Sequence, residues 1–190
     1  MEHKRTVGRA HIGMRNIKTA ATATLVAAIY FLLNRNPAFA CIGVIFGTGN
    51  DMANSWLNGG NRLFGTIFGG VLGMGLFTLY VQVYPQGGYY PLMLLLLFIG
   101  VVLLILISQW FKWPGAIQPG GVMLCIMLFS QPVESYMTYS INRIVDTAIG
   151  VVVALLVNWL LPRERIQRIL HKLSGGRYQP EKNPVPERKK

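Results

Sequence analysis

The chain has 190 residues, of which 52% are hydrophobic and only 13% are charged. Between Arg62 and Arg143 the only charged residues are Lys112 and Glu134, which is too few for a soluble globular surface and is typical of a polytopic membrane protein. The formal net charge of +11 does not indicate nucleic-acid binding, because the cations gather in the two termini that flank the apolar body.

Six apolar runs follow one another in the sequence, and they predict an all-α membrane domain over residues 14–161 with six transmembrane helices. A basic lead over residues 1–13, which we expect to be disordered, precedes this domain. The six runs cover approximately residues 17–33, 38–49, 63–83, 92–108, 116–130 and 144–161.

The second and fifth runs are short for a bilayer, whose crossing takes about 20 residues. The second carries Gly43 and Gly47, and the fifth carries Pro119, Gly120 and Gly121. We therefore expect the second run to be broken, tilted or extended by polar residues, and the fifth to be broken by its Pro-Gly-Gly sequence at residues 119–121. The polar segment 50–61 either continues the second run or forms a re-entrant connection.

A repeated motif opens the third and sixth runs. Residues 61–73 read NRLFGTIFGGVLG and residues 142–154 read NRIVDTAIGVVVA, so Asn, Arg, Thr, Gly and Val recur in register. This indicates an internal duplication. Because each half has three spans, which is an odd number, the two halves should have opposite orientation, as two three-helix inverted repeats.

The charges at the two ends of the chain predict its orientation. We expect residues 162–173 to form a basic amphipathic helix on the inner membrane surface, and residues 174–190 to be a disordered tail. Lysine and arginine are enriched in both termini, which predicts that both lie on the cytoplasmic side of the membrane.

Few cations stand at the ends of the apolar runs, and we select Arg15, Lys18, Arg62 and Arg143 as candidate substrate-binding residues. A cation inside a span costs about 2.5–3.5 kcal/mol on insertion scales, so it usually faces a cavity or a partner. The functional interpretation is attraction of an anionic substrate. The alternative is that each side chain reaches the interface and serves only topology.

Three acidic residues are candidates for gating or proton coupling, namely Asp51, Glu134 and Asp146. Asp146 lies three residues after Arg143, on the same helical face, so it forms a structural ion pair with Arg143, holds it in position, or titrates during transport. Asp51 and Glu134 lie just beyond the second and fifth runs. The alternative interpretation is that each is a solvated acid in a loop.

The short second and fifth runs occupy matching positions in the two halves, which is the best sequence indication of a translocation path in inverted repeats. We therefore predict that the path is lined by Gly43, Gly47, Pro119, Gly120 and Gly121. Gly65, Gly69 and Gly73 lie four residues apart on the third run, a spacing that lets helix backbones approach closely.

No catalytic constellation, phosphate-binding loop or metal-ligand spacing occurs in the sequence, so we predict neither an enzyme nor a cofactor. Cys41 and Cys125 both lie inside apolar runs and are interpreted as small packing residues. The function classes that remain for this sequence are a secondary transporter and a channel.

Four segments carry a resemblance to a known family: GMRNIKTA, PAFACIGV, NRLFGTIFGG and NRIVDTAIGV. Together, over about residues 13–161, they resemble the aromatic acid exporter and fusaric-acid-resistance superfamily, in particular its short bacterial branch with one six-helix unit. Many relatives carry a sizeable cytoplasmic helical domain after the membrane unit, whereas this sequence has only residues 162–190 there. Regulation assigned to that domain is therefore not carried over.

The resemblance implies a six-helix domain that pairs into a homodimer, in the manner of plant aluminium-activated malate channels. It also implies basic residues near an anion path, which by matching positions are Arg15, Lys18, Arg62 and Arg143. The expected partners are a small organic anion, such as an aromatic carboxylate, and membrane lipid. The alternative function is a non-transporting membrane scaffold, or an anchor that binds anionic lipid through the basic tail.

Overall fold

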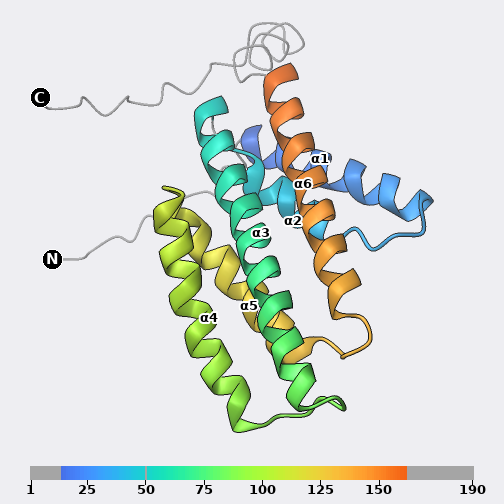
Figure 1. The fold of residues 1–190 in the computed structure, drawn as a ribbon. Helices are drawn as coiled ribbons and strands as arrows, with labels where there is room; N and C mark the ends of the chain where they lie inside the picture. Colours follow the sequence, from blue (N-terminus) through green and yellow to red (C-terminus); the bar gives the residue numbers. More distant parts are fainter. Residues whose placement is uncertain (1–13, 50, 162–190) are drawn as a thin grey trace, which may run out of the picture.

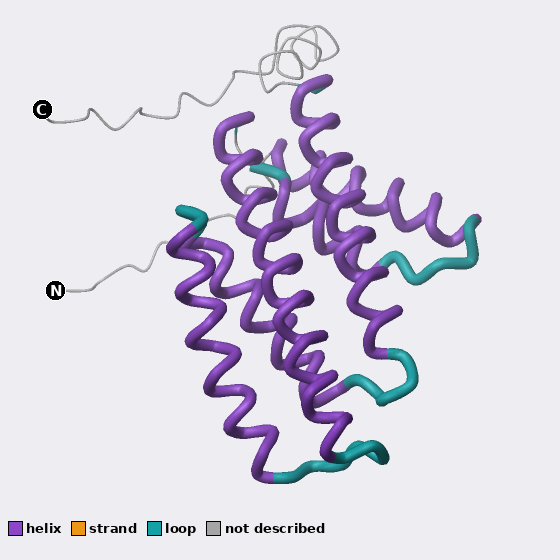
Figure 2. Tube along the Cα trace, viewed as in Figure 1, coloured by secondary structure: helices purple, strands orange, loops and turns teal. Residues whose placement is uncertain are grey.

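The computed structural model describes residues 14–49 and 51–161, and these residues confirm the predicted all-α fold. They form six α-helices and one short 3-10 turn, connected by the loops that Figure 2 shows. The predictions for residues 1–13, 162–173 and 174–190 lie outside the described residues. The helices are α1 (Met14–Leu32), α2 (Ala38–Gly47), α3 (Met52–Val83), α4 (Pro91–Trp110), α5 (Ile117–Ser130) and α6 (Tyr136–Leu160), and the 3-10 turn η1 (Pro114–Ala116) precedes α5.

Three of the helices in the described part of the chain, α3, α4 and α6, are long and apolar enough to cross a membrane. The other three are apolar but shorter, and the predicted shortness of the second and fifth runs is confirmed, because α2 has 10 residues and α5 has 14. In Figure 1, α3 lies between α4 and α6, whereas α1 lies at a steep angle to these long helices.

The predicted break at Pro119 is wrong, because α5 runs without interruption from Ile117 to Ser130. Pro119 stands in the first turn of this helix. Backbone N–H groups in the first turn have no partner within the helix, so proline costs little there. The shortness of α5 therefore comes from its late start after η1, not from an internal kink.

The polar segment before the first Asn-Arg motif neither continues α2 nor forms a re-entrant loop. It forms the first turns of α3, which has 32 residues and begins well before the predicted start of the third span. The Asp51 carboxylate accepts a hydrogen bond from the backbone N–H of Asn54 and thereby caps the helix. Similarly, α6 begins at Tyr136, ahead of the predicted start of the sixth span.

The helices pack in two corresponding pairs, with α2 against α6 and α5 against α3. A glycine from the repeated motif makes the closest approach in each pair. A Cβ at Gly69 would collide with the carbonyl oxygen of Gly120 on α5, and a Cβ at Gly150 with the carbonyl oxygen of Ala40 on α2. The four-spaced glycines of α3 therefore serve packing between helices of the same chain.

A cluster of aromatic and aliphatic side chains fills the space where α3, α4, α5 and α6 meet. Its most buried members are Phe77, Tyr80, Met123, Leu124, Met127 and Leu128. The outward sides of the helices are apolar too, and α4 exposes large side chains along its length, as expected for a helix that faces lipid.

We predict that Gly150→Ala destabilises the protein, because the new methyl group meets the backbone of α2 rather than a movable side chain. The free energy of unfolding in detergent should fall by about 1–3 kcal/mol. Gly75→Ala is the matched control, since Gly75 also lies within a long helix but a Cβ there would meet no atom within 4 Å. An equal loss of stability in both variants would contradict this account.

Candidate functional site

Arg143 lies in the second turn of α6, and only 6% of its surface is exposed. Its guanidinium carbon lies 3.0 Å from the centre of the Phe39 ring and 5.5 Å from that of Tyr139. Aromatic faces attract cations through their quadrupole, so the two rings compensate part of the cost of burying this charge. In the described part of the chain, Arg143 has no carboxylate partner.

Arg62 is the equivalent residue in the first motif, and like Arg143 it lies against a phenylalanine of α2. Its guanidinium carbon lies 5.3 Å from the centre of the Phe46 ring, and its buried Nε has no hydrogen-bond partner among the described residues. Phe39 and Phe46 are seven residues apart on α2, hence two turns along one side. The guanidinium groups of Arg62 and Arg143 therefore lie against rings that are two turns apart on the same side of α2.

We call Arg62, Arg143, Phe39 and Phe46 the arginine centre. It brings together α2, α3 and α6, and it carries two positive charges without an acidic partner in the residues that the structure describes. The hydroxyl of Thr147, one turn after Arg143, is also buried and unpaired there. A buried cation that lacks a carboxylate favours the arrival of an anion.

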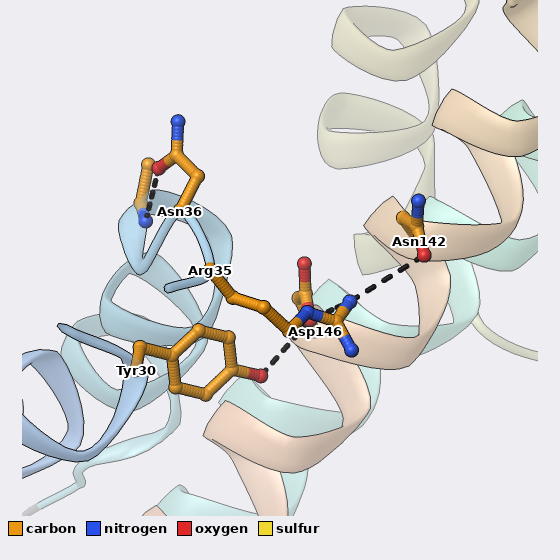
Figure 3. A network of polar contacts seen from close by, with 6 residues as sticks. Tyr30, Arg35, Asn36, Asn142 and Asp146 are labelled. Carbon is orange, nitrogen blue, oxygen red and sulfur yellow. Dashed lines mark hydrogen bonds and ion pairs between the residues drawn. The ribbon is translucent and has the colours of Figure 1, made fainter. Parts of the chain in front are cut away.

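A polar network lies beside the arginine centre, between α6 and the turn that connects α1 to α2 (Figure 3). Asp146 is 5% exposed, and its Oδ1 accepts hydrogen bonds from the Tyr30 hydroxyl at 2.9 Å and from Arg35 Nη2 at 3.1 Å. The same Arg35 nitrogen lies 3.4 Å from the side-chain oxygen of Asn142.

The possible ion pair between Arg143 and Asp146 is not formed, and Asp146 pairs with Arg35 instead. The spacing of residues on α6 could not identify the partner of Asp146, because Arg35 belongs to a turn more than 100 residues earlier in the sequence. Sequence analysis did not select Arg35 as a candidate for the site.

Lys18 lies in a second polar cluster, at the opposite end of α6. Its ammonium group donates to the side-chain oxygen of Asn158 at 2.6 Å and to the carbonyl oxygen of Leu161 at 2.8 Å. Asn158 in turn donates to the hydroxyl of Ser55 at 2.8 Å. Lys18 therefore ties α1 to α6 and α3 and does not reach the arginine centre. The side chain of Arg15 lies outside the described residues.

The other two candidate acids are exposed and lie away from the arginine centre. Asp51 caps α3, with its second carboxylate oxygen bound to the side-chain amide of Asn54 at 2.8 Å. Glu134 lies in the α5–α6 link and borders a hollow of about 230 Å³ between the α3–α4 and α5–α6 loops. Their predicted roles in proton coupling stay predictions.

The predicted path-lining residues lie mainly in helix contacts. Gly43 and Gly47 face α6, at Thr147 and Ala154, and Pro119 and Gly120 face Gly65 and Gly69 on α3. A Cβ at Gly121 would meet no atom within 4 Å. Of the five predicted path-lining residues, Gly121 is therefore the one with open space beside it. Whether these residues line a path stays a prediction.

The comparison with protein-family models decides the family. The model described as aromatic acid exporter family member 1 matches residues 10–161, which include every described helix. The chain belongs to the aromatic acid exporter family. Neither the search of curated proteins nor the search of solved structures found a match.

Membership of the aromatic acid exporter family confirms the resemblance that the sequence motifs carry. It is a family of transporters rather than of enzymes, and together with the long apolar helices it indicates a multi-pass membrane protein.

Sequence analysis of this family member missed several residues of the arginine centre and of the two polar networks, namely Tyr30, Arg35, Phe39, Phe46 and Asn158. The two phenylalanines offered a signal, since aromatic residues seven apart share one side of a helix. Tyr30 and Asn158 offered none, because their partners lie more than 100 residues away along the chain.

We predict that Asn158→Leu destabilises this aromatic acid exporter family member by about 1–3 kcal/mol, because both Lys18 and Ser55 lose a buried partner. Asn142→Leu is the control, since Asn142 is exposed and makes one long contact, and it should change stability by less than about 0.5 kcal/mol. Thermal unfolding in detergent measures both variants, and a smaller loss for Asn158→Leu than for Asn142→Leu would refute the prediction.

Proposed function

We propose that the chain is a permease that carries organic anions, such as aromatic carboxylates, across the bacterial inner membrane. The observation that carries this proposal is the burial of Arg143 against the Phe39 ring of α2, without a carboxylate partner in the described residues, while Arg62 lies against Phe46 on the same helix. Positive charges that lie inside a membrane domain without an acidic partner among the described residues are stabilised when an anion binds to them.

The chemistry of the arginine centre favours a flat carboxylate. A guanidinium group binds a carboxylate through two parallel hydrogen bonds, and its planar face also stacks on aromatic rings. Phe39, Phe46 and Tyr139 supply such rings next to the two arginines. An aromatic acid would therefore place its carboxylate on a guanidinium and its ring among these side chains.

We further propose that the six helices form two inverted repeats of three, with both termini in the cytoplasm. The corresponding packing of α2 on α6 and of α5 on α3 supports the repeats, as do the equivalent close approaches of Gly69 and Gly150. In this arrangement α1, α2 and α5 also cross the membrane, although they are shorter than the other three helices.

The proposed path follows α2 and α5, with Gly43, Gly47, Pro119, Gly120 and Gly121 along it, in a homodimer surrounded by lipid. Arg15 and Lys18, at the start of α1, would attract the anion at the cytoplasmic side. Asp51, Glu134 and Asp146 are the carboxylates proposed for gating or proton coupling, and Asp146 alone of these three is buried.

Replacement of both arginines, Arg62→Gln with Arg143→Gln, should abolish transport while leaving protein abundance intact, because it removes the charge that attracts the carboxylate. The measurement is flux of radiolabelled benzoate into liposomes that contain the purified protein, with and without an imposed pH gradient. Lys112→Gln is the control, since Lys112 is an exposed cation in the α4–α5 link.

Unchanged benzoate flux in the double arginine variant would exclude the proposed role of the arginine centre. Flux driven by the gradient indicates a proton-coupled carrier, and flux independent of it indicates a channel. If the intact wild-type protein moves none of a panel of carboxylates, the scaffold function is favoured instead.

Labelling of single cysteines tests the inverted repeats. In a chain with Cys41 and Cys125 replaced by alanine, a thiol reagent that cannot cross the membrane should label Gln86→Cys and Glu134→Cys from outside the cell, but not Lys112→Cys. The short helix α5 separates positions 112 and 134, so these two should lie on opposite sides. Equal protection of positions 112 and 134 would show that α5 does not cross.

A further inference from the structure

Asp146 is positioned to neutralise Arg143, yet it does not. The two residues are three apart on α6, and side chains at this spacing are neighbours on a helix surface. We propose that Arg35 is a positioning residue that holds Asp146 away from Arg143 and so keeps Arg143 available for the substrate anion. This inference rests on the proposed function and deepens it.

The Asp146 carboxylate is held from the α1 side of the network. Both bonds to its Oδ1 come from there, one from the Tyr30 hydroxyl and one from Arg35 Nη2 (Figure 3). Figure 3 shows the Arg35 side chain extending from its turn across to α6. A charge-assisted bond between two ionised groups is stronger than a bond from a neutral hydroxyl, so Arg35 is the main holder and Tyr30 the lesser one.

Arg35 is itself fixed by the turn between α1 and α2. Its backbone N–H donates to the carbonyl oxygen of Tyr30 at 3.0 Å, and its guanidinium carbon lies 5.9 Å from the centre of the Tyr30 ring. Asn34 adopts a left-handed conformation with φ of 51°, which asparagine tolerates better than most residues. The Asn36 side chain accepts from the N–H of Ala38 at the start of α2. The turn therefore presents Arg35 in a defined place.

Removal of Arg35 would release Asp146 toward Arg143. Asp146 then keeps only the Tyr30 hydroxyl, while Arg143 one turn earlier still lacks a carboxylate among the described residues. A buried carboxylate and a buried guanidinium attract strongly when little water separates them. Because Asp146 is tethered on the same helix, its effective concentration at Arg143 is high, and it competes with a substrate carboxylate.

The test is equilibrium binding of radiolabelled benzoate to the purified protein in detergent, measured on the monodisperse folded fraction. Arg35→Gln should raise the Kd by about tenfold or more, because Asp146 occupies Arg143. Adding Asp146→Asn to Arg35→Gln should return the Kd to within about threefold of wild type, since the competing charge is gone. Arg35→Lys, which keeps a cation for Asp146, should also bind nearly as wild type does.

Two results would overturn the inference: a Kd unchanged by Arg35→Gln, or a double variant that binds no better than Arg35→Gln alone. A purely structural role for Arg35 would lower the folded fraction and leave the Kd of the remaining protein unchanged, so it gives the first of these results. Failure of the proposed function looks different, because wild type and Arg143→Gln would then bind benzoate equally.

Discussion

The structure depends on a guanidinium group that is buried in a membrane domain without a carboxylate, among the described residues, to neutralise it. Taking a cation out of water costs several kcal/mol unless other groups replace the solvent. Around Arg143 these groups are the faces of Phe39 and Tyr139, which attract the charge but do not cancel it. The arginine therefore stays positive and able to bind an anion, which an ion pair with a neighbouring acid would prevent.

Close helix packing places that charge. The phenylalanine rings that lie against Arg62 and Arg143 both belong to α2, a helix of ten residues. For α2 to approach α6 closely enough, the contact must lack bulky side chains on both sides, as it does where Gly150 meets Ala40 and Gly43. The glycine two turns after Arg143 in the repeated motif therefore sets the distance at which this arginine meets α2.

Much of the fold was predictable from sequence because the signals are local. Apolar runs mark the helices, and the repeated motif marks the two arginines and their glycines. The boundaries of α3 and α6 were not predictable in this way, since turns rich in polar residues continue the helices beyond the apolar runs. The break expected at Pro119 failed because the cost of a proline depends on its position in the helix, which is set by where η1 ends.

The partner of Asp146 was the least predictable feature, and it also decides the charge of the site. Asp146 is the one buried carboxylate in the part of the chain that the structure describes, and two arginines compete for it, Arg143 from its own helix and Arg35 from a distant turn. Local spacing favours Arg143. Asp146 pairs with Arg35 for two reasons. The Tyr30 hydroxyl binds the same carboxylate oxygen from the same side, and the Arg35 side chain is 43% exposed, so its charge costs less to accommodate than that of the buried Arg143. With this choice, the acid neutralises the arginine that water already stabilises and leaves the buried one positive.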